Sequence, residues 1–317
     1  MAAKQSKKGR LVKRGYAETR FGQLHYAMAG EGEPLILLHQ SARSWKSFAK
    51  LMEILAPRYR MIAFDYPGFG ESDWFQEPYE FTDVVQSVVD GLDDLKVKSK
   101  MRLFGHHTGA AVACHIAANY PERVAAAVMS GYPYMESEAE RRAYLGISTQ
   151  QSYKTVKGGP RSLPVTPLEQ DGTHLTRLWQ RATMRLWQAK NMIPNEGVVT
   201  PEEIEFINDW VLDAVKANSA APVTFQELWK YDSDTNLKRI KAPALLVQLT
   251  GPYERDICQR AHLVQPLVPH AKVAVIERGD IYMIYWRAAE VAGILTRFFD
   301  NPSGFKSQPI PPPPAKK

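Results

Sequence analysis

Residues 101–110, with the sequence MRLFGHHTGA, decide the fold of this 317-residue chain. They lead from a short apolar run into a helical stretch, residues 111–120, through the pattern Gly-x-X-x-Gly. Gly105 and Gly109 leave room for a sharp, strained turn that lifts the central residue above the end of the strand. The central residue is His107. We therefore expect a histidine at a prominent position between a buried strand and a helix.

Short apolar runs alternate with helical stretches along the rest of the chain. Six runs that are too short for helices predict buried parallel strands, at residues 34–39, 61–65, 101–105, 124–130, 244–249 and 272–276. Helical patterns fall between them, at residues 81–95, 108–120 and 288–299. An antiparallel pair, residues 16–20 and 23–28, is expected at one edge. The alternation predicts an α/β fold, with a mostly parallel open sheet and helices on both faces.

The alternation breaks over residues 134–237, which show helical periodicity and no strand-like run. We expect this insertion to form a helical lid over the carboxyl ends of the strands, where open α/β sheets bind ligands. The core is then expected at residues 15–133 and 238–300. A basic tail over residues 1–14 and a proline-rich tail over residues 301–317 are expected to be disordered.

Composition excludes several classes of protein. The net charge of +6 comes from the two tails, so no basic face suggests a nucleic-acid partner. No apolar run approaches the roughly 18 residues of a membrane span, and the charged start is not a secretory signal. Two cysteines, Cys114 and Cys258, cannot build a disulfide framework. We expect a cytoplasmic protein with a small-molecule ligand, without a nucleic-acid or membrane partner, and we leave a homodimer open.

Three further segments match one family in the same order as the turn at His107. They are the strand end Leu37-Leu38-His39, the turn DYPGFGES at residues 65–72 and the helix stop YPER at residues 120–123. With the turn, they resemble the α/β-hydrolase fold superfamily over about residues 16–300. The resemblance implies the fold, a helical lid, and a Ser, Asp or Cys nucleophile at the elbow, the position of His107.

The three catalytic positions that the resemblance implies are all altered in this chain. The nucleophile is replaced by His107, and the usual histidine after the last strand is replaced by Ile281. The usual acid after the preceding strand should lie within residues 249–253, yet no carboxylate occurs before Glu254. The chain is therefore not a hydrolase that has lost only its nucleophile.

The oxyanion site is better preserved. The resemblance implies that the backbone N–H groups of Thr108 and Ser41 would stabilise a developing negative charge. The usual His-Gly before Ser41 has become His39-Gln40. We count His39 and Gln40 as substrate-binding candidates, together with His174 in the insertion and Tyr282 after the last strand.

Three histidines near the site, His39, His106 and His107, raise the question of a metal. The superfamily commonly carries histidines at the first two positions, hydrogen-bonded inside the fold without a metal. A zinc site would also need a convergent third ligand, and only Asp65 is expected nearby. We expect neither a metal nor a cofactor.

Three functions stay open. In the first, His107 is a general acid or base oriented by Asp280, which lies one residue from the position of the lost histidine. Such an enzyme would act on a small, largely apolar carbonyl compound, by ester or lactone hydrolysis or by a lyase, decarboxylase or isomerase step. In the second, the chain is a non-catalytic small-molecule receptor, and in the third a partner-binding pseudo-hydrolase. A titratable side chain at a strained position favours the enzyme.

Overall fold

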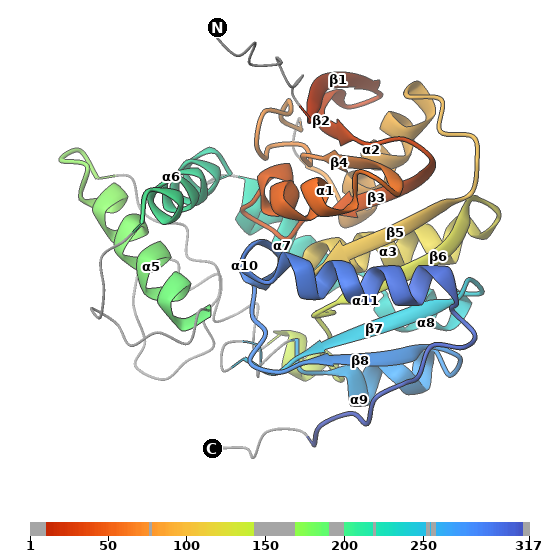
Figure 1. The fold of residues 1–317 in the computed structure, drawn as a ribbon. Helices are drawn as coiled ribbons and strands as arrows, with labels where there is room; N and C mark the ends of the chain where they lie inside the picture. The colour runs from red at the N-terminus through yellow and green to blue at the C-terminus, as the bar shows by residue number, and fades with distance from the viewer. Residues whose placement is uncertain are drawn as a thin grey trace, which may run out of the picture.

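The computed structural model describes residues 11–75, 78–142, 169–189, 200–217, 220–251, 254 and 258–312. Its strands form one eight-stranded sheet in the order β1-β2-β4-β3-β5-β6-β7-β8 (Figure 1). The strands are β1 (Lys13–Thr19), β2 (Gly22–Ala29), β3 (Glu33–Leu38), β4 (Tyr59–Phe64), β5 (Met101–His106), β6 (Val124–Ser130), β7 (Ala244–Leu249) and β8 (Lys272–Ile276). β1 pairs antiparallel with β2, and β2 antiparallel with β4, whereas the pairs from β4 to β8 are parallel. The predicted strands and edge pair are confirmed.

Helices cover both faces of the sheet because its central strands are apolar on both sides. In β3, Ile36 and Leu38 join one buried cluster, and Leu35 and Leu37 join the other. The first cluster includes α2 (Phe81–Asp94), α3 (Thr108–Asn119), α7 (Ala220–Lys230), α8 (Ser233–Arg239) and α9 (Ala261–Val264). The second includes α1 (Ala49–Leu55), α10 (Met283–Trp286) and α11 (Ala288–Asp300). Short 3-10 turns are η1 (Trp45–Phe48), η2 (Pro121–Arg123) and η3 (Gln265–Leu267).

The insertion between β6 and β7 contains helices joined by turns and, in its described part, no strand. It contains α5 (Thr173–Ala189) and α6 (Pro201–Lys216), followed by α7 and α8. α5 and α6 pack together in a third apolar cluster that also contains Tyr282 from the loop after β8. In Figure 1 they lie to one side of the sheet, beside α10.

α6 is tied to the loop after β3. The Ser44 hydroxyl donates to Asp213 Oδ2 at 2.9 Å, and Lys46 forms an ion pair with Asp209. Because Ser44 follows β3 and Tyr282 follows β8, α6 packs at the carboxyl ends of the parallel strands. This is the position at which open α/β sheets bind ligands.

The ends of the chain are more ordered than the sequence suggested. β1 already begins at Lys13, within the expected basic tail. Within residues 301–312, the Ser307 hydroxyl and the Gln308 side chain accept from the N–H groups of Val273 and Val275, each at 2.8 Å. The prediction of disorder is wrong here, because β8 is an edge strand whose free backbone groups need partners. Residues 1–10 and 313–317 lie outside the described part.

None of the described helices combines the length and the hydropathy that crossing a membrane requires.

Candidate active site

The turn between β5 and α3 has the strained geometry that the sequence predicted. His107 has φ 50° and ψ −117°, in the region that side chains other than glycine rarely adopt. A Cβ on Gly105 would lie 2.0 Å from the Gly109 carbonyl oxygen, and a Cβ on Gly109 would lie 2.0 Å from the Leu38 carbonyl oxygen. Only glycine therefore fits at either position. Such backbone strain costs about 1–3 kcal/mol and is concentrated at functional sites.

The imidazole of His107 faces two buried side chains from the loop after β7. Its Nε2 lies 2.9 Å from Oε2 of Glu254, and its Nδ1 lies 3.5 Å from Sγ of Cys258. The Glu254 side chain is 1% exposed, whereas that of His107 is 14% exposed and so can be reached from solvent. Nε2 and Oε2 are close, but they are not aligned as a hydrogen bond. The contact is that of an ion pair when the ring is protonated.

Glu254 occupies the place beside His107 that we had expected for Asp280. Asp280 is buried, and its Oδ1 accepts from the Tyr282 N–H at 2.9 Å. Its carbonyl accepts from the Met283 N–H at 3.0 Å, at the start of α10. Asp280 thus holds the turn that leads into α10, and the carboxylate in ion-pair contact with His107 is Glu254 instead of the predicted Asp280. The signal was present in the sequence, since Glu254 is the first carboxylate after β7.

Ile281, at the position of the missing histidine, contacts the ends of two other strands through its backbone carbonyl. The carbonyl of Ile281 accepts from the Gln40 side-chain amide at 3.3 Å. The same carbonyl lies 3.3 Å from Nε2 of His106. The loop after β8 is thus held through its backbone by the side chains of Gln40 and His106, without the help of a histidine at position 281.

His39 and His106 have structural positions, as the resemblance implied. His39 Nδ1 pairs with the Gln40 carbonyl at 2.8 Å, and its Nε2 accepts from the Tyr66 N–H at 3.2 Å. Burial lowers the pKa of His39 to about 4. Burial, with a contribution from the charge of His107, also lowers the pKa of His106 well below its usual value. Both rings are therefore neutral near pH 7 and are engaged within the fold.

The two candidate oxyanion residues lie together. The Ser41 N–H donates to the Thr108 hydroxyl oxygen at 3.3 Å, and both residues are buried. Thr108 is the first residue of α3, where a backbone N–H has no partner inside the helix. The partial positive charge of the helix start adds to the field of these amides. The arrangement suits a negative charge on a carbonyl oxygen.

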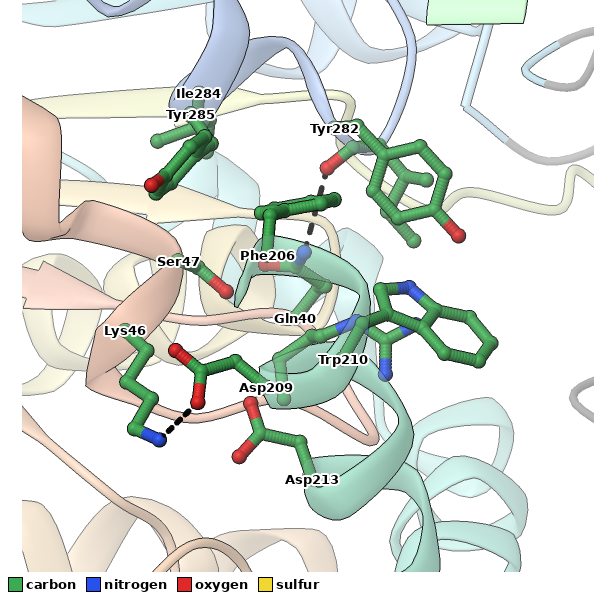
Figure 2. Close-up of a pocket in the computed structure, with 12 residues that line it drawn as sticks. Gln40, Lys46, Ser47, Phe206, Asp209, Trp210, Asp213, Tyr282, Ile284 and Tyr285 are labelled. Atoms are coloured by element: carbon green, nitrogen blue, oxygen red, sulfur yellow. Dashed lines mark hydrogen bonds and ion pairs between the residues drawn. The ribbon is translucent and has the colours of Figure 1, made fainter. Parts of the chain in front are cut away.

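A small cavity of about 30 Å³ opens beside the site. Figure 2 shows the side chains around it, which come from the loop after β3, from α6 and from the segment after β8. Gln40 and Tyr282 line it, as expected. His174 does not: it lies at the start of α5, where its Nδ1 accepts from the Glu169 N–H at 3.1 Å.

Among the cavity residues that were not predicted, Arg43 and Asp213 are charged side chains that are buried. Arg43 is buried with its guanidinium 3.9 Å from the ring centre of Trp210. Asp213 on α6 is also buried, and burial raises its pKa to about 7, despite the opposing charge of Arg43. Nothing in the sequence distinguishes Asp213 from its acidic neighbours on the same helix, because its burial depends on how α6 packs.

One group of side chains in the described part could hold a metal ion. One ring nitrogen of His107, one carboxylate oxygen of Glu254 and Sγ of Cys258 all lie within 4.8 Å of one another. Of the three histidines that raised the question of a metal, His107 belongs to this group, whereas His39 and His106 do not. Glu254 and Cys258 were missed because both lie in a loop without a recognisable ligand spacing.

The class of α/β-fold hydrolases is defined by a mostly parallel sheet and a strained strand-to-helix turn. The turn of this chain also has Ser41 and Thr108, the two candidate oxyanion residues, next to each other. A model of the alpha/beta hydrolase fold family matches residues 33–249, and the chain belongs to that family. The recognition of the fold from sequence is thus confirmed.

Similar proteins of known function are hydrolases. Epoxide hydrolase 4 of Mus musculus is 36% identical over 35% of this chain and 32% of its own length. The 2-hydroxy-6-oxo-6-phenylhexa-2,4-dienoate hydrolase of Comamonas testosteroni is 33% identical over 34% of this chain and 39% of its own length. The matches thus span only about a third of these relatives.

Solved structures support the fold over nearly the whole chain. An enol-lactonase from Burkholderia xenovorans LB400 superposes with a TM-score of 0.66 at 16% identity, covering 90% of this chain and 100% of that one. E-2-(acetamidomethylene)succinate hydrolase gives a TM-score of 0.66 at 19% identity, covering 91% and 99%. At such identities the likeness shows the fold alone.

Proposed function

We propose that the chain is a hydrolase of non-serine type that acts on a small, largely apolar ester or lactone, with His107 as the general base. One observation carries the proposal: a solvent-reachable imidazole, held at the strained elbow, lies 2.9 Å from a buried carboxylate. A base and a carboxylate that stabilises its protonated form are two of the three parts of a hydrolytic triad. The names of the dienoate hydrolase and the enol-lactonase, which describe carbonyl substrates, support the substrate class.

The third part of the triad, a nucleophile, would be water. His107 takes a proton from a water molecule, and the resulting hydroxide attacks the carbonyl carbon of the substrate. Glu254 stabilises the imidazolium that forms, because its charge is buried and close. The imidazolium then returns the proton to the leaving alkoxide as the tetrahedral intermediate collapses, so the ring ends the cycle unchanged.

The amides of Ser41 and Thr108 would hold the oxyanion of that intermediate. In the structure, the Thr108 hydroxyl accepts the Ser41 N–H. A substrate carbonyl must therefore displace this hydroxyl before it can accept from Ser41. Each such donor contributes about 3–4 kcal/mol to the stabilisation of the transition state.

The proposal is tested by turnover of p-nitrophenyl acetate and δ-valerolactone. His107→Ala is expected to lower kcat/KM by about 10²–10⁴-fold, the usual contribution of a general base. Glu254→Gln should lower kcat/KM by about 10²-fold, which is less than the roughly 10⁴-fold loss of rate when an aligned triad carboxylate is replaced. Asp280→Asn is the comparison, and it should change the rate far less.

Two results would contradict this assignment. A rate that survives His107→Ala would exclude the ring as the base. A fluorophosphonate probe should leave the wild-type chain unlabelled, and labelling of Ser41 or Thr108 would identify a serine-type or threonine-type nucleophile instead.

A second function, that of a partner-binding pseudo-hydrolase, is favoured by the small size of the cavity. A volume of about 30 Å³ holds only two or three water molecules. Phe206 and Trp210 from α6 take up the adjacent space. A receptor or a partner-binding pseudo-hydrolase would give no turnover in the wild type, and its His107→Ala variant would keep its ligand or partner.

A further inference from the structure

We propose that His107, Glu254 and Cys258 form a binding site for a late first-row divalent cation, with Zn²⁺ as the best match to the donors. The proposal goes beyond hydrolysis and does not depend on it; because a His107 ring that binds a cation is not free to act as the base, the two proposals describe different states of the site. The cation proposal rests on the distances among the three donors, on their chemistry and on two buried polar atoms that have no hydrogen-bond partner.

The distances are close to those that a tetrahedral ion requires. Zn–N and Zn–O bonds of about 2.0–2.2 Å and Zn–S bonds of about 2.3 Å place ligand atoms roughly 3.3–3.6 Å apart. In the structure, Nε2 of His107 lies 2.9 Å from Glu254, whereas the other ring nitrogen, Nδ1, lies 3.5 Å from Cys258. One donor atom from each of the three residues falls within 4.8 Å of the others. Rotation of side chains, without movement of the backbone, would therefore bring one donor from each residue around one ion.

The orientation of the ring fits one such rotation. The thiol lies next to Nδ1 and the carboxylate next to Nε2, on either side of Cε1. A half turn of the imidazole about Cβ–Cγ exchanges Cε1 with Nε2, which brings one nitrogen between the sulfur and the oxygen. The backbone at the elbow need not move.

The polar atoms of this group lack partners. Nε2 of His107 and Oε2 of Glu254 are buried and make no hydrogen bond in the described part of the chain. Buried polar atoms are nearly always satisfied, and this misaligned pair, which forms an ion pair only when the ring is protonated, would gain a partner from a bound cation. Glu254, 1% exposed, is the kind of buried carboxylate that needs a cation.

The donor set selects the metal. A thiolate, an imidazole and a carboxylate together suit Zn²⁺ and its neighbours, whereas Mg²⁺ and Ca²⁺ prefer oxygen donors alone. Burial, with a contribution from Glu254, raises the pKa of the Cys258 thiol, so a bound cation would have to displace its proton. The guanidinium of Arg260, whose charge also reaches Cys258, is paired with Glu140 at 2.9 Å. The partly exposed face of His107 leaves a fourth position for water.

The test is metal binding to the full chain. Titration with ZnCl₂ by calorimetry should give one site per chain, and CoCl₂ should produce the near-ultraviolet charge-transfer band of a thiolate ligand. Glu254→Gln should weaken binding by more than the roughly 10–100-fold that loss of an outer-shell partner costs. Cys258→Ser should abolish the cobalt band. Cys114→Ser, at a buried cysteine of α3 outside the group, should leave both signals intact.

A second measurement guards against variants that do not fold. Zinc should raise the Tm of the wild-type chain and of Cys114→Ser, because a ligand of the folded state stabilises it by mass action. It should not raise the Tm of His107→Ala. Absence of a zinc-dependent Tm shift in the wild type, or an equal shift in His107→Ala, would overturn the proposal. Neither readout requires turnover, so failure of the hydrolase proposal would not affect it.

Discussion

Replacing Asp213 by asparagine should change how the stability of the protein depends on pH. Asp213 is buried between α6 and the loop after β3, and the Ser44 hydroxyl donates to it at 2.9 Å. Burial raises its pKa from 3.8 to about 7, with the charge of Arg43 acting in the opposite direction. The folded chain thus keeps a proton on Asp213 that the unfolded chain releases near pH 4.

The sign and size of the effect follow from this difference. The stability that Asp213 contributes is fully present below pH 3.8 and is lost as the pH rises towards 7. Each pH unit between these limits lowers the free energy of unfolding of the wild-type chain by about 1.4 kcal/mol, which amounts to roughly 4 kcal/mol over the whole range. Asparagine has no proton to lose. The free energy of unfolding of Asp213→Asn, relative to wild type, should therefore rise by roughly 4 kcal/mol from pH 4 to pH 8.

The assay is urea unfolding of both proteins at several pH values, with the difference between them plotted against pH. Asp209→Asn is the matched control, because Asp209 lies one turn earlier on α6 and its side chain is one third exposed. Its ion pair with Lys46 should contribute less than about 1 kcal/mol. A flat difference curve for Asp213→Asn would refute the argument that this carboxylate is buried and protonated in the folded state.

Two further predictions concern the core. Gly109→Ala should lower the free energy of unfolding by more than about 4 kcal/mol or prevent folding, because its Cβ would meet the Leu38 carbonyl. Gly293→Ala, inside α11 with only Arg297 at 3.4 Å, should instead raise it by about 0.5–1 kcal/mol. Equal urea midpoints for the two variants would contradict the elbow geometry. Ser72→Ala should lower the free energy of unfolding by about 1–3 kcal/mol, because the buried Ser72 hydroxyl accepts from the His25 N–H at 2.9 Å and donates to the Asp65 carbonyl at 2.7 Å. An unchanged urea midpoint would show that the loss of these two hydrogen bonds does not affect stability.

The sequence predicted the sheet well because strands and helices in an α/β fold have separate local patterns. The elbow was predictable because the Gly-x-X-x-Gly spacing is itself local, although the atom that excludes a side chain at Gly109 is the Leu38 carbonyl oxygen of another strand. The insertion helices were recognised by their periodicity, but the burial of Asp213 depends on residues more than 160 positions away. Such long-range contacts leave no local pattern in the sequence.

The site was predicted in part. His107 stands where the turn places it, and Ser41 and Thr108 meet as expected. Glu254 contacts the ring instead of the predicted Asp280. The prediction used the nearness of Asp280 in sequence to the position of the lost histidine, and nearness in sequence does not determine which carboxylate lies beside His107 in the fold. Asp280 instead satisfies the first N–H groups of its own loop, as a short acidic side chain before a helical turn commonly does.

The carbonyl of Ile281 also has a consequence for protein engineering. Because the Gln40 amide and His106 hold this carbonyl, the loop that carries the catalytic histidine in related hydrolases is already docked against the strand ends. His107→Ser together with Ile281→His would restore the residue types that the resemblance implies at these two positions. Because the loop is held through its backbone, these two replacements leave the contacts of the carbonyl at position 281 in place.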